Sequence, residues 1–408
     1  MTDSNLVASA HIAETAVPTE HGLRVLLILS ALLAFASIST DLYLPAMPVM
    51  ATALHASHGT LELTVSGYLL GFSLGQLFWG PLSDRYGRRL PVAAGLLLFV
   101  LSSAGCALAT DGTLLIAARL VQAIGACASV VLARAMVRDL YAGRQAAQMM
   151  SKLMTIMAIA PLAGPTLGGQ ILHLASWQAI FWLLVLVGLL TLASLLLLPE
   201  TLPAERRSPT SVRDVVRRYA TLLSHKRFLG YVATGGFFYA GTFAYIAGSP
   251  FAYIDYHHVA PRLYGVLFAA GIAGLMFTNQ LNARLLNRYD SDRVLLAGGL
   301  LAAAAGLLLA LNTWRDWGGL GLMFFACFVF VAATGFVLAN SIAGALNSFP
   351  QFSGSASALA GALQYGSGIA GSALVAAFAD GSAWPMGTVM AVCGIGCALS
   401  ARWVGRQG

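Results

Sequence analysis

Long apolar segments alternate with short polar ones along almost the whole chain. A helix that crosses a bilayer needs about 20 mostly apolar residues, and twelve segments of roughly that length can be recognised. They lie near residues 23–48, 61–82, 90–109, 113–134, 147–172, 177–198, 228–252, 262–283, 292–311, 318–340, 353–378 and 383–404. The pattern therefore predicts an all-α integral membrane protein with twelve transmembrane helices.

The longest polar interruption, residues 200–227, divides the predicted spans into two sets of six. This division predicts two six-helix bundles, at 23–199 and 228–408, joined by a cytoplasmic central loop. Within the loop, apolar residues recur at helical spacing from Val212 to Tyr219 and predict a short amphipathic helix. Residues 1–22 are polar and lack the features of a signal peptide, so we expect a cytoplasmic tail before a retained first span.

The composition of the chain excludes a soluble protein. Only 10% of its 408 residues are charged and 58% are hydrophobic, whereas a soluble globular domain carries about 25% charged residues. The formal charge of +7 would suit a nucleic-acid partner, but the placement of the charges argues against one. Of the 23 lysines and arginines, only Arg262 and Arg315 fall in loops on the side opposite the termini. By the positive-inside rule we expect both termini in the cytoplasm and no nucleic-acid partner.

The cysteines and the motif content do not favour an enzyme. All five cysteines lie in apolar segments without metal-ligand spacing, and we interpret them as small buried hydrophobic residues. The chain contains no P-loop and no recognisable Ser/His/Asp or Cys/His set. We therefore expect no cofactor, no metal and no enzymatic activity. A membrane sensor or a lipid-modifying enzyme is the alternative class.

Two charges stand inside the predicted spans. Asp41 lies in the apolar segment that begins at Leu23, and Arg119 lies in the segment 113–134. An isolated charge at the bilayer centre costs about 2.5–3.5 kcal/mol on insertion scales, so each should face a cavity or a partner. At about 1.5 Å per residue, both fall in the outer half of a hydrocarbon core about 30 Å thick. They can therefore meet at one level, and the alternative is that Asp41 is a water-exposed acid at a helix end.

Prolines and further acidic residues lie on the predicted outer side of the protein, beyond Asp41. Pro45 and Pro48 predict that the first helix does not continue unbroken. Glu62, at the outer end of the second span, is interpreted as a solvated helix-end carboxylate rather than a second proton site. Asp255 and Asp380 are interpreted in the same way.

The stretch GPLSDRYGRRLPV, residues 80–92, connects the second and third predicted spans. Its glycines permit tight backbone turns, and its aspartate can accept hydrogen bonds at a helix end. The G-x-x-x-D-R-x-G-R-R spacing resembles the loop signature of the major facilitator superfamily. The resemblance implies that this loop latches two halves of the protein together in the outward-facing state. The residues that it assigns to the latch are Gly80, Asp84, Arg85, Gly87, Arg88 and Arg89, with Asp139 as the acidic partner.

Two further stretches resemble motifs of proton-driven members of that superfamily. RLVQAIGA, which begins at Arg119, is similar to the R-x-x-Q-G-x-G element of the fourth span, with Ala123 in place of the first glycine. APLAGPTLGGQI, residues 160–171, resembles the antiporter signature G-x-x-x-G-P-x-x-G-G, with Ala160 in place of the first glycine. Small residues allow close helix packing, and proline kinks a helix. The antiporter helix implied by the resemblance is centred on Gly164, Pro165, Gly168 and Gly169.

The stretch DLYLPAMP, which begins at Asp41, resembles the bicyclomycin-resistance (Bcr/CflA) group of drug exporters, as do SWQAIFW, PETLP and HKRFLGY. The resemblance covers nearly the whole chain. It implies a monomeric exporter in the bacterial inner membrane that exchanges protons for bicyclomycin-like and other small amphipathic drugs by alternating access. Proton-coupled export of a metabolite, such as an amino acid or a sugar-like compound, is the alternative.

On this hypothesis Asp41 and Arg119 couple transport to protons. Asp41 takes up a proton when it faces outside and releases it inside, and Arg119 favours the ionised form of the carboxyl. The substrate cavity should be mostly apolar with a few polar anchors. The candidate cavity residues are Tyr43, Tyr68, Phe72, Gln76, Phe238, Tyr239, Tyr245 and Gln364.

Overall fold

A computed structural model describes residues 19–141, 143–207, 212–315, 317–347, 349 and 353–406. These residues form helices and connecting turns, and no strand occurs among them. The helices of the first part are α1 (Thr19–Asp41), η1 (Leu44–Ala46), α2 (Met47–Ala53), α3 (His58–Tyr86), α4 (Arg89–Ala107), α5 (Gly112–Leu140), α6 (Gly143–Leu174), α7 (Trp177–Ser194), η2 (Leu195–Leu197), η3 (Ala204–Arg206) and α8 (Val212–Leu223). Those of the second part are α9 (Lys226–Pro250), the π-helical turn η4 (Phe251–Tyr256), α10 (Pro261–Leu285), α11 (Ser291–Arg315), α12 (Gly319–Ala332), α13 (Thr334–Asn347), α14 (Ser353–Ala377) and α15 (Trp384–Gly405).

Each predicted span corresponds to a long helix or to a pair of helices in line. The first segment breaks after Asp41, as its prolines predict, and continues through η1 into α2. The segment 318–340 breaks at Ala333 into α12 and α13, which the sequence did not indicate. The break is stabilised by a neighbouring helix, because the Thr278 hydroxyl of α10 donates a 2.5 Å hydrogen bond to the Ala332 carbonyl. The predicted helix of the central loop is present as α8.

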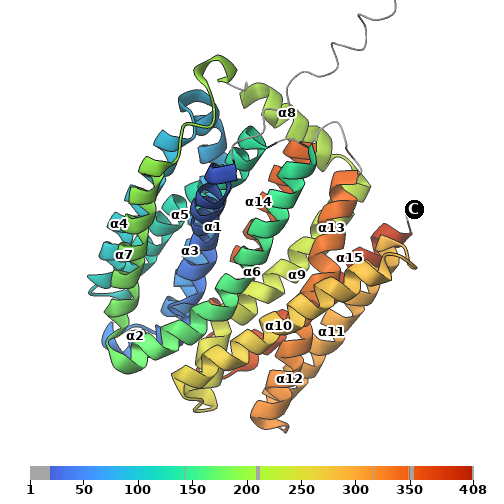
Figure 1. The fold of residues 1–408 in the computed structure, drawn as a ribbon. Coiled ribbons are helices and arrows are strands. Elements are labelled where there is room, and N and C mark those ends of the chain that lie inside the picture. The colour runs from blue at the N-terminus through green and yellow to red at the C-terminus, as the bar shows by residue number, and fades with distance from the viewer. Residues whose placement is uncertain are drawn as a thin grey trace, which may run out of the picture.

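The long helices pack as two groups (Figure 1). In the N-terminal half, defined as α1 to α7, α5 packs against α3 and α4, and α1 packs against α5 and α6. In the C-terminal half, defined as α9 to α15, α15 packs against α9 and α11, and α9 packs against α14. The two halves meet mainly where α3 lies against α14 and α6 lies against α10.

The two ends of the helical bundle differ in charge. The arginine-rich end, along the upper and right-hand side of Figure 1, carries the α3–α4 turn, α8 and the α10–α11 turn. The opposite end, at the bottom, carries α2, the start of α3 and the turn from η4 to α10.

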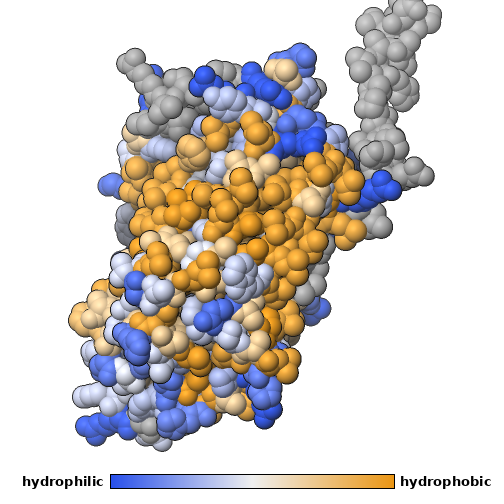
Figure 2. Space-filling model, turned by 90° about the vertical axis from the view of Figure 1, so that its left-hand side faces the viewer, coloured by the Kyte–Doolittle hydropathy of each residue, from blue (hydrophilic) through white to orange (hydrophobic). Residues whose placement is uncertain are grey.

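The surface between the two ends is apolar. In Figure 2 orange side chains cover much of the middle of the visible face, and blue side chains gather towards both ends. Eight of the described helical segments are long and apolar enough to cross a membrane. The other four long helices, α3, α6, α9 and α14, carry more polar positions and lie largely where the halves meet. Several of their glycines pack closely against neighbouring helices, and glycine adds little to the hydropathy of a segment.

Candidate functional site

The first helix ends at Asp41, directly against the glycine-rich part of α6. A Cβ atom added at Gly164 would lie 3.0 Å from the Asp41 Cβ atom, and one added at Gly168 would lie 1.8 Å from the Leu42 carbonyl oxygen. One added at Gly169 would lie 2.7 Å from the Pro261 carbonyl oxygen of the C-terminal half. The stretch that resembles an antiporter motif therefore holds α6 against both the Asp41 turn and the other half.

Arg119 lies on α5 and is completely buried. Its Nη1 atom donates hydrogen bonds to the Ser39 carbonyl oxygen (2.9 Å) and to Gln122 Oε1 (2.5 Å). Gln122 Nε2 in turn donates to Ser103 Oγ on α4 (2.6 Å). The expectation that this arginine has a partner is confirmed, and its hydrogen-bond acceptors are a helix carbonyl and an amide.

Two tyrosine rings cover the Arg119 guanidinium. Its Cζ atom lies 4.1 Å from the ring centroid of Tyr43 and 4.4 Å from that of Tyr68, which are cation–π distances. The Tyr43 hydroxyl is hydrogen-bonded to Thr64 (2.9 Å), and the Tyr68 hydroxyl is hydrogen-bonded to Ser39. Both predicted cavity tyrosines are thus fixed in place around the arginine.

Asp41 is 5% exposed. It interacts electrostatically with Arg119, but no ion pair joins the two side chains in the part of the chain that the structure describes. The carboxyl also interacts electrostatically with Tyr239 and Tyr264 of the C-terminal half. Asp41 therefore interacts both with Arg119 and with the C-terminal half, and its interaction with the arginine acts beyond the distance of an ion pair.

An aromatic group joins the two halves near this site. The ring of Phe72 on α3 lies 4.8 Å from that of Tyr365 on α14, and Tyr365 lies 5.3 Å from Tyr239 on α9. Two of these residues are predicted cavity residues, and Tyr365 was missed. Tyr365 lies in a segment rich in small residues, and only its contact with another helix distinguishes it from ordinary packing.

The remaining cavity candidates are not brought into this group. Phe238 stacks on Phe330 at 5.2 Å, and Tyr245 stacks on Phe268 at 5.6 Å, so both pack within the C-terminal half. Gln364 is buried beside Gly235, also within that half. Gln76 is half-buried and faces Gly361 of α14 across the interface between the halves.

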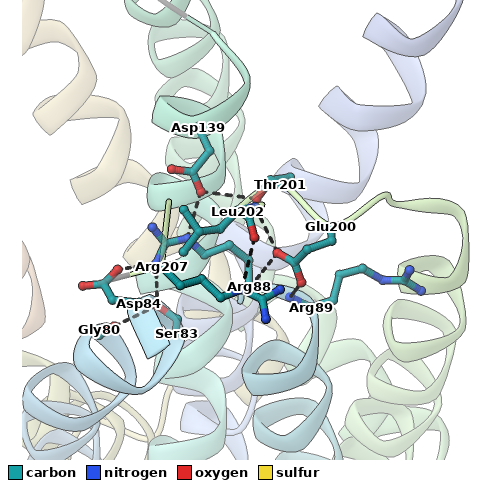
Figure 3. Close-up of polar contacts among 10 residues, drawn as sticks. All are labelled: Gly80, Ser83, Asp84, Arg88, Arg89, Asp139, Glu200, Thr201, Leu202 and Arg207. Atoms are coloured by element: carbon teal, nitrogen blue, oxygen red, sulfur yellow. Dashed lines mark hydrogen bonds and ion pairs between the residues drawn. The ribbon is translucent and has the colours of Figure 1, made fainter. Parts of the chain in front are cut away.

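A polar network surrounds Arg88 at the arginine-rich end (Figure 3). Arg88 Nε donates to Asp139 Oδ2 (2.8 Å), and its Nη1 donates to Asp84 Oδ1 (2.7 Å) and to Ser83 Oγ (2.6 Å). Gly87, with φ of +88°, makes the turn that places Arg88 here. The predicted pairing of this loop with Asp139 is present, and the pairing side chain is Arg88.

Glu200 completes the network and was not predicted. Its carboxylate accepts hydrogen bonds from the backbone N–H groups of Arg88 (2.7 Å), Arg89 (3.2 Å) and Leu202 (3.1 Å). Partial burial alone raises the pKa of Glu200, but these three N–H groups and the charge of Arg207 outweigh it and hold the pKa below its usual value. The carboxylate also faces the start of α4, where a negative charge is favoured.

The structure modifies the expected latch in three respects. Within the described residues, the partners of the Arg88 network belong to the N-terminal half and to the start of the central loop, whereas the resemblance implied a contact between halves. Arg85 is exposed and lies over the Tyr86 ring, outside the network. A Cβ atom at Gly80 would meet nothing within 4 Å, so this glycine is not required for close packing.

The two halves are closed against each other at the opposite end. His58 Nε2 of α3 lies 3.3 Å from Asp255 Oδ2 of η4. A Cβ atom at Gly59 would lie 2.5 Å from the Ala376 carbonyl oxygen of α14. The halves are therefore in contact at this end, whereas the described partners of the Arg88 network at the other end do not join them.

The interpretation of Glu62 as a solvated carboxylate is wrong. Its side chain lies in the same closed end and is 4% exposed, because α14 and α15 cover the start of α3. Asp380, in contrast, is exposed and accepts hydrogen bonds from Ser382, and Asp255 is partly exposed. Their solvated interpretation is consistent with the structure.

The contact between α6 and the Asp41 turn predicts a large effect of adding one methyl group. Gly168→Ala should destabilise the protein by about 1–3 kcal/mol, because the new Cβ atom forces the two backbones apart. The midpoint of thermal unfolding in detergent measures the effect. Gly321→Ala is the control, because a Cβ atom there meets nothing within 4 Å. Equal midpoints for both variants would show that α6 does not pack as described.

The hydrogen bonds of Glu200 predict an acid-sensitive contribution to stability. Glu200→Gln should cost about 1 kcal/mol at neutral pH, since it weakens acceptors for three N–H groups near solvent. Because the pKa is lowered in the folded protein, the stabilisation is present above the ordinary value of 4.5 and is lost as the pH falls through the lowered pKa.

Thermal unfolding at neutral and acidic pH tests this expectation. The difference between wild type and Glu200→Gln should shrink in acid, whereas the exposed control Glu205→Gln should match wild type throughout. A difference that does not change with pH would contradict the assigned role of the carboxylate.

Comparisons with known proteins agree with this geometry. The sequence profile described as "Major Facilitator Superfamily" matches residues 27–372. The uncharacterized MFS-type transporter YdgK of Bacillus subtilis is 37% identical over 364 residues, which cover 88% of this chain and 89% of that protein. The bicyclomycin resistance protein homolog of Haemophilus influenzae is 30% identical over 86% of this chain and 89% of its own length.

A solved structure shows the same fold at low sequence identity. The xylose transporter XylE from E. coli, in a partially occluded inward open conformation, superposes with a TM-score of 0.71 and 16% identity. The superposition covers 95% of this chain and 98% of that one. Matched along most of its length by profile, relatives and fold, the chain belongs to the Major Facilitator Superfamily and is a multi-pass membrane transporter.

Proposed function

We propose that this protein exports drugs from the bacterial cytoplasm across the inner membrane in exchange for protons. The observation that carries the proposal is the packing of the antiporter-like glycines of α6 directly on the Asp41 turn. This contact joins the motif to the carboxyl that the sequence singled out for proton binding. The similarity to a bicyclomycin resistance protein homolog and to the multidrug resistance protein D of E. coli supports drugs as the substrate class.

The distribution of charge supports an orientation in the membrane. Lysines and arginines gather at the end that carries the α3–α4 turn, α8 and the α10–α11 turn. By the positive-inside rule this end faces the cytoplasm, with both termini on that side. The opposite end, where the halves are closed, then faces outside. The proposed transporter is a monomer.

The proposed cycle uses Asp41 as the proton carrier. The carboxyl binds a proton while the site is open to the outside, and the drug leaves as the proton binds. The halves then rock, the site opens to the cytoplasm, and the proton is released as a new drug molecule binds. Arg119 stabilises the ionised carboxyl electrostatically, and its hydrogen bonds to Ser39 and Gln122 keep its position fixed.

The site proposed for the drug lies beside the aromatic group Phe72, Tyr365 and Tyr239. These rings come from both halves, so rocking changes their separation. Aromatic faces bind flat apolar and cationic molecules without strict geometry. This suits a transporter with several amphipathic substrates.

The membrane potential supplies enough energy for this exchange. One charge that crosses 100 mV releases about 2.3 kcal/mol, which corresponds to an approximately fifty-fold concentration ratio of a neutral drug. Under this proposal no nucleotide hydrolysis is required.

A panel of drug-susceptibility assays tests the proposal. The protein is expressed in bacteria that lack their own exporters, and growth is measured with unrelated amphipathic drugs. We expect increased resistance to several of them. Resistance to none, together with export of a single amino acid or sugar-like compound, would favour the metabolite exporter instead.

A further inference from the structure

The closed end contains a carboxyl that the proposed cycle does not use. His58, Glu62 and Ser66 are spaced four residues apart on α3 and therefore share one face. His58 is paired with Asp255, and Ser66 Oγ lies 2.7 Å from Ser372 Oγ of α14. This face of α3 thus lies against the C-terminal half, and we call the region from His58 to Ser66, with its partners on η4, α14 and α15, the gate.

Glu62 lies in the middle of the gate and has an unpaired oxygen. Its Oε2 atom is buried and has no hydrogen-bond partner among the described residues. The cavity beside the side chain has a volume of about 10 Å³, which leaves room for one water molecule at most. Its walls combine apolar side chains, among them Phe251, Val375 and Met386, with the polar side chains of His58 and Ser382.

The charged groups around the gate do not neutralise an ionised Glu62. His58 lies one helical turn away, but it is paired with Asp255, and its ring stacks on Phe251 at 4.4 Å. His258 interacts electrostatically with Asp255. Asp380, in the turn between α14 and α15, is exposed and held by Ser382. In the described part of the chain no lysine or arginine forms an ion pair with Glu62.

An ionised carboxylate is costly in such a place. Burial without a partner costs several kcal/mol, and a group so placed becomes neutral instead. Resting on the function proposed above, we propose that Glu62 is a second proton-binding residue of this transporter and that it must bind a proton before the gate closes.

Linkage fixes the direction of the pH dependence. The closed gate retains the proton, whereas the open gate exposes the carboxyl to water and allows it to ionise. Acid outside therefore favours the closed gate, and this closure is lost as the external pH rises. Proton binding at Glu62 thus promotes the step in which a proton-loaded transporter turns from outside to inside.

Distances between spin labels on the two halves test this inference. Leu108 on the N-terminal half and Trp314 on the C-terminal half are 66% and 65% exposed near the opposite end and can be replaced by labelled cysteines. The five native cysteines are buried and are first replaced by alanine. Distances are measured in lipid at about pH 5 and about pH 9, which bracket the titration of a buried carboxyl.

Wild type should shift to longer distances at the higher pH, and Glu62→Gln should remove the shift and keep the short distance. Glu62→Asp should retain a pH-dependent shift, which separates proton binding from misfolding. The matched control Asp255→Asn removes the other gate carboxylate and should leave the Glu62-dependent shift in place. A shift that persists in a folded Glu62→Gln protein would overturn the inference.

The same labels separate this inference from the proposed function. In an Asp41→Asn background, the pH-dependent shift should remain, because Glu62 can still bind and release its proton. If the shift disappears with Asp41→Asn and remains with Glu62→Gln, the inference fails while the proposed proton carrier stands. If drugs are not exported but Glu62→Gln still abolishes the shift, the proposed function fails while the gate assignment stands.

Discussion

Replacing Asp41 by asparagine should abolish proton-coupled drug resistance while leaving the protein inserted and folded. Asparagine has nearly the same volume as the aspartate and keeps the Cβ atom that packs beside Gly164, so it should fit in the same place. It cannot bind and release a proton in the relevant pH range. Since one charge across 100 mV supports an approximately fifty-fold drug gradient, the inhibitory drug concentration should fall about tenfold or more.

Growth of expressing cells at graded drug concentrations measures this effect. The amount of protein in the membrane is quantified for each variant. The control Asp290→Asn removes a carboxylate that is 83% exposed at the arginine-rich end and should match wild type. Full resistance with Asp41→Asn at normal expression would exclude Asp41 as the proton carrier.

Arg119 should resist even conservative replacement. Arg119→Lys keeps the charge but replaces a planar guanidinium by a compact ammonium. The ammonium cannot make the Ser39 and Gln122 hydrogen bonds and also stack on the two tyrosine rings. Arg119→Gln removes the charge as well, so it no longer stabilises the ionised carboxyl nearby. Both variants should lose transport, because a buried charged hydrogen bond contributes about 1.5–3 kcal/mol.

Drug binding as a function of pH distinguishes the two roles of this arginine. The pH of half-maximal binding should move upward in Arg119→Gln and should move much less in Arg119→Lys. Arg315→Gln, an exposed arginine at the opposite end, serves as the control. An unchanged pH profile in Arg119→Gln would make the arginine a purely structural residue.

Much of the fold was predictable because lipid imposes a simple rule on sequence. A helix in a bilayer needs an apolar surface, so the position of nearly every long helix follows from hydropathy. The break at Ala333 could not be predicted in this way. It depends on Thr278, a residue of another helix that is 54 positions away and donates a hydrogen bond to the Ala332 carbonyl.

The site was predictable where one residue carries an unusual energetic cost. Asp41 and Arg119 stand out in any apolar segment, whatever their neighbours. Glu62 did not stand out, because a carboxylate at a helix end costs little free energy unless another helix covers it and removes it from water. Only the packing of α14 on α3, with Pro385 and Met386 of α15 beside the side chain, shows that it is buried.

The Arg88 network shows the same limit at the surface. The loop motif was recognised, but its acceptor Glu200 lies 112 positions from Arg88. The stretch PETLP, which contains Glu200, resembles the drug exporters, but the resemblance assigns no partner to this glutamate. Contacts between distant segments set which of several arginines is buried, and a single sequence does not contain them.

The central claim is that drug export and proton movement occur in one exchange. The purified protein is reconstituted into vesicles that contain a pH-sensitive dye, and an amphipathic drug gradient is applied without a membrane potential. The account predicts proton movement opposite to the drug gradient in wild type and none with Asp41→Asn. Drug movement without any proton movement in wild type would contradict it.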